Sequence, residues 1–132
     1  MFASTLGNQV IAHFIGDFIL QSDWAAENKY KKFLVALTHA ILYTAPFILL
    51  TTNPLALLII CITHALIDRY KLARYVAWAR NWIAPIRPKP WKECSFTGYD
   101  PSRPLWISVW LMIIVDNLMH VIINAIAIGI FS

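Results

Sequence analysis

Long apolar segments alternate with short polar segments along this chain, and the apolar segments predict helices. Each is close to the roughly 20 residues that a helix needs to cross a membrane. The four predicted spans are residues 5–21, 33–52, 55–70 and 105–131. The third span is the weakest, because its strictly apolar part ends near Ile67; a segment that enters the membrane without crossing it is the alternative. The pattern predicts an all-α fold, an integral membrane four-helix bundle that forms a single transmembrane domain over residues 1–132.

The stretch between the third and fourth spans has a different pattern. Leu72, Val76, Ala79 and Ile83 recur at spacings of three and four, and basic and aromatic residues lie between them. This pattern is typical of an amphipathic helix on anionic lipid headgroups, which we expect to contact residues 69–92. An extension of the third helix is the alternative. Several prolines then predict an irregular loop up to residue 104.

Composition and charge place the predicted bundle in a membrane. The chain is 59% hydrophobic and only 14% charged, which is too apolar for an ordinary soluble domain. Residues 69–103 carry eight basic and two acidic side chains, and residues 25–32 are also basic. Short basic loops stay in the cytoplasm, so both termini are predicted to lie outside. The net charge of +4 then serves orientation and lipid contact, and no nucleic acid partner is expected.

Histidines and aspartates recur within the predicted spans at a spacing of four residues. Side chains at this spacing lie about 40° apart around a helix and can bind one ligand together. Counted from the cytoplasmic ends at about 1.5 Å per residue, these side chains lie at overlapping depths in four helices. They are the pairs His13 with Asp17 and His64 with Asp68, the reversed pair Asp116 with His120, and the lone His39.

An aspartate within a membrane span has a free-energy cost that other interactions must offset. An aspartate at the centre of a span costs about 2.5–3.5 kcal/mol on insertion scales, so Asp17 and Asp116 together cost about 6 kcal/mol before they find partners. His/Asp hydrogen bonds that only hold the bundle together are one explanation. The repetition of the pair favours a metal site. Imidazole and carboxylate ligands suit zinc, with manganese or iron as alternatives, and seven donors predict two divalent ions.

The segment His13-Phe14-Ile15-Gly16-Asp17 resembles the HFxGDxxxPxH motif of zinc-dependent phospholipase C and the fungal zinc nucleases. In those soluble helical enzymes, the motif supplies ligands to a zinc cluster that cleaves phosphodiesters. The resemblance implies that His13 and Asp17 are ligands, with Asp23 in place of the last histidine. His64 and Asp68 would supply the second motif. The chain departs from the pattern at Asp23 and at Gln21, which stands where the motif has proline.

A broader resemblance covers most of the chain. Residues 13–29, Thr38-His39-Ala40, residues 64–71 and residues 116–124 resemble an uncharacterised family of small multi-spanning proteins in bacteria and their phages. That family is distantly similar to membrane-bound metal-dependent hydrolases. The resemblance implies a multi-pass protein of the bacterial inner membrane and supports the same ligand set, but it supplies no established reaction.

These inferences together predict a metal-dependent hydrolase of a phosphoester bond in a lipid or lipid-linked phosphate. Asp23 is expected to act as a ligand or general base, and Arg69 as a phosphate clamp or a side chain that extends to the interface. A transport path for divalent ions or protons is one alternative. A phage or host membrane protein that acts by contact is another. A homo-oligomer is one alternative for its assembly.

Overall fold

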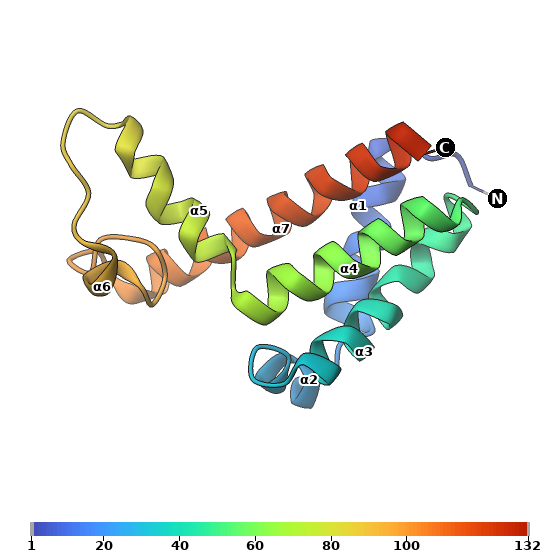
Figure 1. The fold of residues 1–132 in the computed structure, drawn as a ribbon, viewed down its shortest axis with the longest axis horizontal. Coiled ribbons are helices and arrows are strands. Elements are labelled where there is room, and N and C mark those ends of the chain that lie inside the picture. Colours follow the sequence, from blue (N-terminus) through green and yellow to red (C-terminus); the bar gives the residue numbers. More distant parts are fainter. Residues whose placement is uncertain (1, 132) are drawn as a thin grey trace. The chain divides into compact units, whose positions relative to one another are not determined.

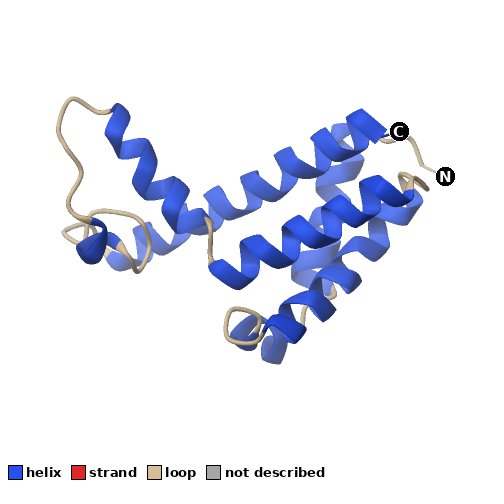
Figure 2. Cartoon of the chain, in the orientation of Figure 1, coloured by secondary structure: helices blue, strands red, loops and turns tan. Residues whose placement is uncertain are grey.

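Helices and their connecting loops make up residues 2–131, the part of the chain that the computed structural model describes (Figure 2). The all-helical class predicted from the sequence is confirmed for these residues. The described chain forms two compact units. Unit 1 comprises residues 2–70 and 120–131, and unit 2 comprises Lys71–Met119.

Unit 1 contains the first helices and the end of the last one (Figure 1). Helices α3 and α4 pack as an antiparallel pair; the π segment η1 contacts α3, and α1 contacts the 3₁₀ segment η2 that follows α3. The elements are α1 (Leu6–Phe14), the π-helical segment η1 (Ile15–Ile19), α2 (Asp23–Asn28), α3 (Phe33–Thr44), the 3₁₀ segment η2 (Ala45–Leu49), α4 (Pro54–Tyr70) and the C-terminal part of α7 (Leu105–Phe131).

Capping side chains explain where several of these helices begin. Thr5 accepts a hydrogen bond from the backbone N–H of Asn8 at 3.2 Å, and Ser22 caps α2 in the same way. Asn53 Oδ1 accepts hydrogen bonds from the first N–H groups of α4, and Pro54 follows it at the first helical position. These residue types satisfy the N–H groups that a helix leaves free at its start.

Two helices change their hydrogen-bonding pattern partway along. The α3 helix ends at Thr44 and continues as a 3₁₀ segment at Pro46, as expected because proline lacks an N–H and crowds the preceding turn. The first helix turns into the π segment η1, where Leu20 N–H donates to Ile15 O, five residues back, at 3.0 Å. The sequence analysis had not predicted this π segment.

Unit 2 contains α5 (Ala73–Ala79), the 3₁₀ segment η3 (Arg80–Ile83), the short α6 (Trp91–Cys94) and the first part of α7. Helix α4 ends at Tyr70, and Lys71 follows with a left-handed φ of 50°. The basic stretch is therefore a separate short helix and not an extension of the third helix. Gly98, with a φ of 82°, lies so close to Arg74 O that a Cβ would overlap it.

The apolar core of unit 1 joins α1, α3, η2, α4 and α7. The rings of Tyr43 and Phe47 are completely buried at its centre, with ring centroids 5.4 Å apart. Smaller side chains fill the space around them: Ala12, Leu50, Ile60, Ala127 and Ile128. This core fixes the relative positions of the helices that carry the candidate ligands.

Helix lengths differ from the predicted spans. One described helix, α7, is long and apolar enough to cross a membrane, and it matches the predicted span at residues 105–131. The segment Phe33–Leu49 is shorter, and α4 has 17 residues, about 25 Å against a hydrocarbon core of about 30 Å. In place of the first predicted span, residues 5–21, the structure has a helix over residues 6–19 only. The membrane-embedded four-helix bundle therefore stays a prediction.

Candidate metal centre

All four histidines of the chain are buried in unit 1, and each comes from a different helix. Their exposed fractions do not exceed 2%. They are His13 on α1, His39 on α3, His64 on α4 and His120 on α7. Four imidazoles in one small core are unusual because histidine is only moderately often buried, and their convergence needs a chemical explanation.

Two histidines and two aspartates form a compact group of donor atoms at the centre of this unit. The atoms are Asp17 Oδ1 on η1, His39 Nε2 on α3, and His64 Nε2 and Asp68 Oδ2 on α4. His39 Nε2 lies 3.1 Å from Asp17 Oδ1, 3.1 Å from His64 Nε2 and 3.5 Å from Asp68 Oδ2. His64 Nε2 lies 3.4 Å from Asp17 Oδ1 and 3.0 Å from Asp68 Oδ2. All four residues are buried.

These distances match the edges of a small coordination tetrahedron. Nitrogen and oxygen ligands that lie 2.0–2.1 Å from a zinc ion are about 3.3–3.4 Å from one another. Five of the six edges of this tetrahedron run from 3.0 to 3.5 Å. Without an ion, only one proton can lie between the two facing nitrogens of His39 and His64. This buried group could therefore bind a metal ion.

The surroundings of Asp68 agree with this interpretation. Its Oδ2 atom is buried and approached by nitrogens of Lys29, His64 and His39 at 2.8, 3.0 and 3.5 Å. A buried carboxylate needs cationic or hydrogen-bonding partners. The Lys29 ammonium is one such partner, and a metal ion bound between Asp68 and the two imidazoles would be another.

The other two histidines adjoin the four-donor group. His120 Nδ1 lies 3.2 Å from His64 Nδ1, and His120 Nε2 lies 3.7 Å from Asp68 Oδ1. His13 Nδ1 lies 3.5 Å from Asp17 Oδ2. The predicted pairs His13 with Asp17 and His64 with Asp68 therefore meet in space. Asp116 precedes His120 by one turn of α7, but it belongs to unit 2 and is half-buried.

Tyr43 is a central residue of the site that the sequence analysis missed. Its hydroxyl lies 2.8 Å from His13 Nδ1 and accepts a hydrogen bond from Asn124 Nδ2 at 2.6 Å. Its ring stacks on the His64 imidazole. Tyr43 follows His39 by four residues, so the spacing used for the His/Asp pairs could have found it.

Lys29 is the second residue that was missed. It follows α2 directly, and its Nζ lies 2.8 Å from Asp68 Oδ2. Its side chain is 19% exposed, so the ammonium group enters the edge of the buried cluster. The sequence analysis assigned this basic loop only a role in membrane orientation, since sequence spacing does not indicate that a loop lysine reaches a distant helix.

The two residues proposed for catalysis lie elsewhere. Asp23 is exposed in the first turn of α2 and is not part of the four-donor group. Arg69 donates a hydrogen bond from Nη1 to Tyr30 O at 2.8 Å, and its guanidinium lies 5.3 Å from the Tyr70 ring centroid. In this arrangement Arg69 holds the loop that contains Lys29. Its role as a phosphate clamp stays a prediction.

A protein-family model described as "Protein of unknown function (DUF3307)" matches residues 6–131. The chain belongs to the DUF3307 family. The DUF3307 match includes both units and all four histidines, in agreement with the expected uncharacterised family. No curated protein and no solved structure matches the chain. Membership of the DUF3307 family does not identify a reaction, so the similarity to hydrolases stays a prediction.

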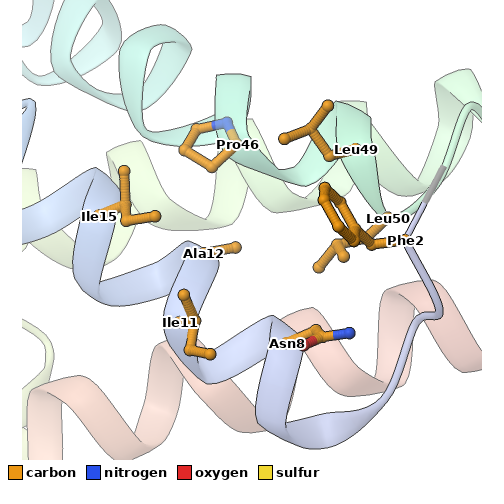
Figure 3. Close-up of a pocket in the computed structure, with 8 residues that line it drawn as sticks. All are labelled: Phe2, Asn8, Ile11, Ala12, Ile15, Pro46, Leu49 and Leu50. Carbon is orange, nitrogen blue, oxygen red and sulfur yellow. The ribbon is translucent and has the colours of Figure 1, made fainter.

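An apolar pocket in unit 1 is separate from this cluster. It has a volume of about 220 Å³ and lies between α1 and η2 (Figure 3). Its lining is apolar except for one amide and contains none of the candidate ligands: Phe2, Asn8, Ile11, Ala12, Ile15, Pro46, Leu49 and Leu50. Because the pocket lacks ionisable groups, the chemistry of the protein is better sought at the His/Asp cluster.

Proposed function

We propose that this protein is a membrane-embedded metal-dependent hydrolase that acts on a phosphoester bond in a lipid or lipid-linked substrate. The four-donor group of Asp17, His39, His64 and Asp68 carries the proposal. Two imidazoles and two carboxylates form a ligand set that suits zinc, with manganese or iron as alternatives.

Charge balance supports a bound cation. The two carboxylates bring two negative charges into a buried region, and such charges are retained only when they are paired or bound to a cation. The Lys29 ammonium pairs with one of them. A dication would neutralise both aspartates while the imidazoles remain neutral. This group accounts for one ion; the second ion, with His13, Asp116 and His120 as further ligands, stays a prediction.

A bound divalent ion would supply Lewis acidity for phosphoester cleavage, both by polarising a phosphoryl oxygen and by lowering the pKa of a water ligand. The residues of this chain would hold and orient the reacting groups. Tyr43 and Asn124 form a hydrogen-bonded pair behind His13, which fixes the imidazole at the edge of the cluster. Asp23 is retained as a general base in the proposal, and it would need to approach from α2.

Apolar surface supports a location in the bacterial inner membrane. Besides α7, helices α3 and α4 of unit 1 expose large apolar side chains, among them Leu34, Leu58 and Ile62, at 45–74% of their surface. Soluble monomers rarely expose extensive apolar patches, whereas lipid covers such surfaces. A lipid-borne phosphate would reach the cluster from the bilayer, and both termini are proposed to face outward.

Elemental analysis of the detergent-purified protein tests the proposal first. We expect about one or two zinc, manganese or iron ions per chain in the wild type and a loss of metal in His64→Ala. Thr63→Ala is the matched control, because Thr63 adjoins His64 and its hydroxyl donates to Ile59 O within its own helix at 2.7 Å. The metal-loaded protein would then be assayed for hydrolysis of short-chain phospholipids in mixed micelles.

Two results would contradict the proposal. One is a wild type that neither retains metal during purification without chelator nor takes up added zinc or manganese. The other is a metal-loaded wild type that releases no product from phospholipids or from nucleotide phosphodiesters. In either case, the His/Asp contacts would have only a structural role, in holding the helices together.

A further inference from the structure

The ammonium group of Lys29 reaches a candidate ligand. Its Nζ lies 2.8 Å from Asp68 Oδ2, the atom that also belongs to the four-donor group. The Asp68 side chain is 3% exposed, whereas that of Lys29 is 19% exposed. Lys29 therefore connects the buried cluster with the surface.

Two hydrogen bonds fix the backbone around Lys29. Lys29 N–H donates to Ala25 O at 2.8 Å, at the end of α2. The next residue, Tyr30, accepts the hydrogen bond from Arg69 Nη1 at 2.8 Å. Because Arg69 follows Asp68 in α4, this hydrogen bond ties the loop to the end of the helix that supplies two donors. These hydrogen bonds therefore keep Lys29 beside the cluster.

The charges change when a divalent ion is present. Asp17 and Asp68 together carry two negative charges, and Lys29 carries one positive charge. A dication bound by both carboxylates would cancel their charge and engage the Asp68 oxygen that Lys29 contacts. Lys29 would then keep a positive charge without a counter-ion, at the point where the cluster approaches the surface.

We propose that Lys29 binds a phosphoryl oxygen of an anionic ligand once the metal site is loaded. This inference rests on the proposed function and specifies which residue recognises the substrate. Lysine is a common phosphate ligand because its ammonium presents three donors and a compact charge. The same loop carries Lys31 and Lys32, which are both exposed and add positive charge near Lys29.

A purely structural role for Lys29 makes a different prediction. If Lys29 only neutralises Asp68 in the metal-free protein, its removal lowers the stability of that form and leaves anion binding to the loaded form unchanged. If Lys29 recognises the anion, its removal weakens anion binding while the metal content is kept. The two roles are separated by measuring the metal-loaded protein.

The test is the binding of inorganic phosphate to zinc-loaded protein in detergent, measured by titration calorimetry. The variants are Lys29→Met, which removes the charge and keeps the apolar stem, and Lys29→Arg, which keeps the charge. Lys31→Met is the matched control: it removes the same charge two residues away, from a side chain that lies over the Tyr30 ring at 5.2 Å. Zinc content and size-exclusion profiles are measured for every variant.

We expect Lys29→Met to weaken phosphate binding about tenfold or more, the effect of losing one charge-assisted hydrogen bond. Zinc content should stay the same, Lys29→Arg should keep most of the affinity, and Lys31→Met should stay within about twofold of the wild type. Equal phosphate affinity in Lys29→Met and Lys31→Met, with zinc bound to both, would overturn the inference and leave the proposed hydrolase intact.

Other outcomes bear on the two proposals separately. Lys29-dependent phosphate binding without hydrolysis of any tested ester would support the inference and contradict the hydrolase. A wild type without zinc would overturn both. A parallel titration with dihexanoyl phosphatidic acid distinguishes the source of the phosphate: tighter, Lys29-dependent binding than that of inorganic phosphate indicates a lipid headgroup, and equal binding indicates a free phosphate.

Discussion

The Tyr43 ring lies parallel to the imidazole of His64, with centroids 3.6 Å apart and planes inclined by 16°. This stacking fixes the plane of the His64 imidazole. The two ring nitrogens of His64 face different partners. Nε2 points to the four-donor group, and Nδ1 points to His120. Tyr43 therefore orients a candidate ligand through its ring and contacts His13 through its hydroxyl.

Removal of that hydroxyl alone separates the two functions of Tyr43. Tyr43→Phe keeps the stacked ring but leaves Asn124 Nδ2 and His13 Nδ1 without this buried partner. We expect the free energy of unfolding to fall by about 1–3 kcal/mol, with metal content unchanged because the tyrosine is not in the four-donor group. Chemical unfolding in detergent and elemental analysis measure the two effects. Loss of metal in Tyr43→Phe would contradict this expectation and show that the metal site depends on the hydroxyl.

The close contact between Gly16 and Tyr43 predicts a sharp response to one added methyl group. A Cβ at Gly16 would lie 2.5 Å from Tyr43 Cδ2 and 3.0 Å from Tyr43 O. Gly16→Ala should therefore destabilise the protein by about 1–3 kcal/mol through overpacking, measured as a lower unfolding temperature. Gly129→Ala is the control, because nothing lies within 4 Å of its Cβ position, and alanine there should be neutral or favour the helix. Equal effects at both sites would contradict the packing argument.

Metal binding should stabilise the folded protein by mass action. With free zinc at about 100 times its dissociation constant, the free energy of unfolding should rise by about 2.7 kcal/mol, and chelator should reverse the effect. Asp17→Asn and His39→Ala should abolish the increase. Thr38→Ala should keep it, because Thr38 is exposed and donates only to Leu34 O among the described contacts. An increase that persists in Asp17→Asn would place the zinc elsewhere.

The turn around Asp100 in unit 2 predicts a response to acid. A hydrogen bond from the Ser102 N–H, followed by the Lys89 ammonium and the Ser102 hydroxyl, lowers the pKa of Asp100 to about 2. The ordinary value is about 3.9, so the stabilisation of this turn is complete above that pH. It is lost as the pH falls through about 2, when the folded form takes up the proton.

Carboxyl carbon NMR of the labelled protein measures this titration directly. Asp100 should titrate near pH 2, and Lys89→Met should move its pKa upward because one of the favourable charges is removed. Lys92→Met is the control for net charge in the same loop. A midpoint near 4 for Asp100 in the wild type would show that the turn does not form in solution.

Spacing arguments could predict which histidines and aspartates meet, but not how the first helix is built. His64 and Asp68 lie four apart in a regular α-helix, and their side chains meet as expected. His13 and Asp17 also meet, although Asp17 lies in the π segment. Hydrophobic periodicity does not indicate such a segment, in which Gly16 lies close against Tyr43 of another helix.

The sequence predictions mainly missed long-range contacts made by flexible or aromatic side chains. Lys29 belongs to a charged loop in the sequence, and only the fold shows that it reaches Asp68, 39 residues later. The boundaries of the apolar segments were closest for α7, where no proline or internal break occurs. They were too long for the first two segments, where η1 and η2 end the regular helix early.

The π segment also decides how the first helix tolerates loss of a residue. A π turn contains about one residue more than an α turn, so loss of a single residue within Ile15–Ile19 would allow an unbroken α-helix. The helical residues on either side would keep nearly their present faces, because the π turn accommodates its extra residue locally. Loss of Phe18 would keep the spacing of four between His13 and Asp17, whereas loss of Ile15 would reduce it to three. Deletion of Ile15 is therefore expected to harm the cluster more than deletion of Phe18, although neither removes a donor atom.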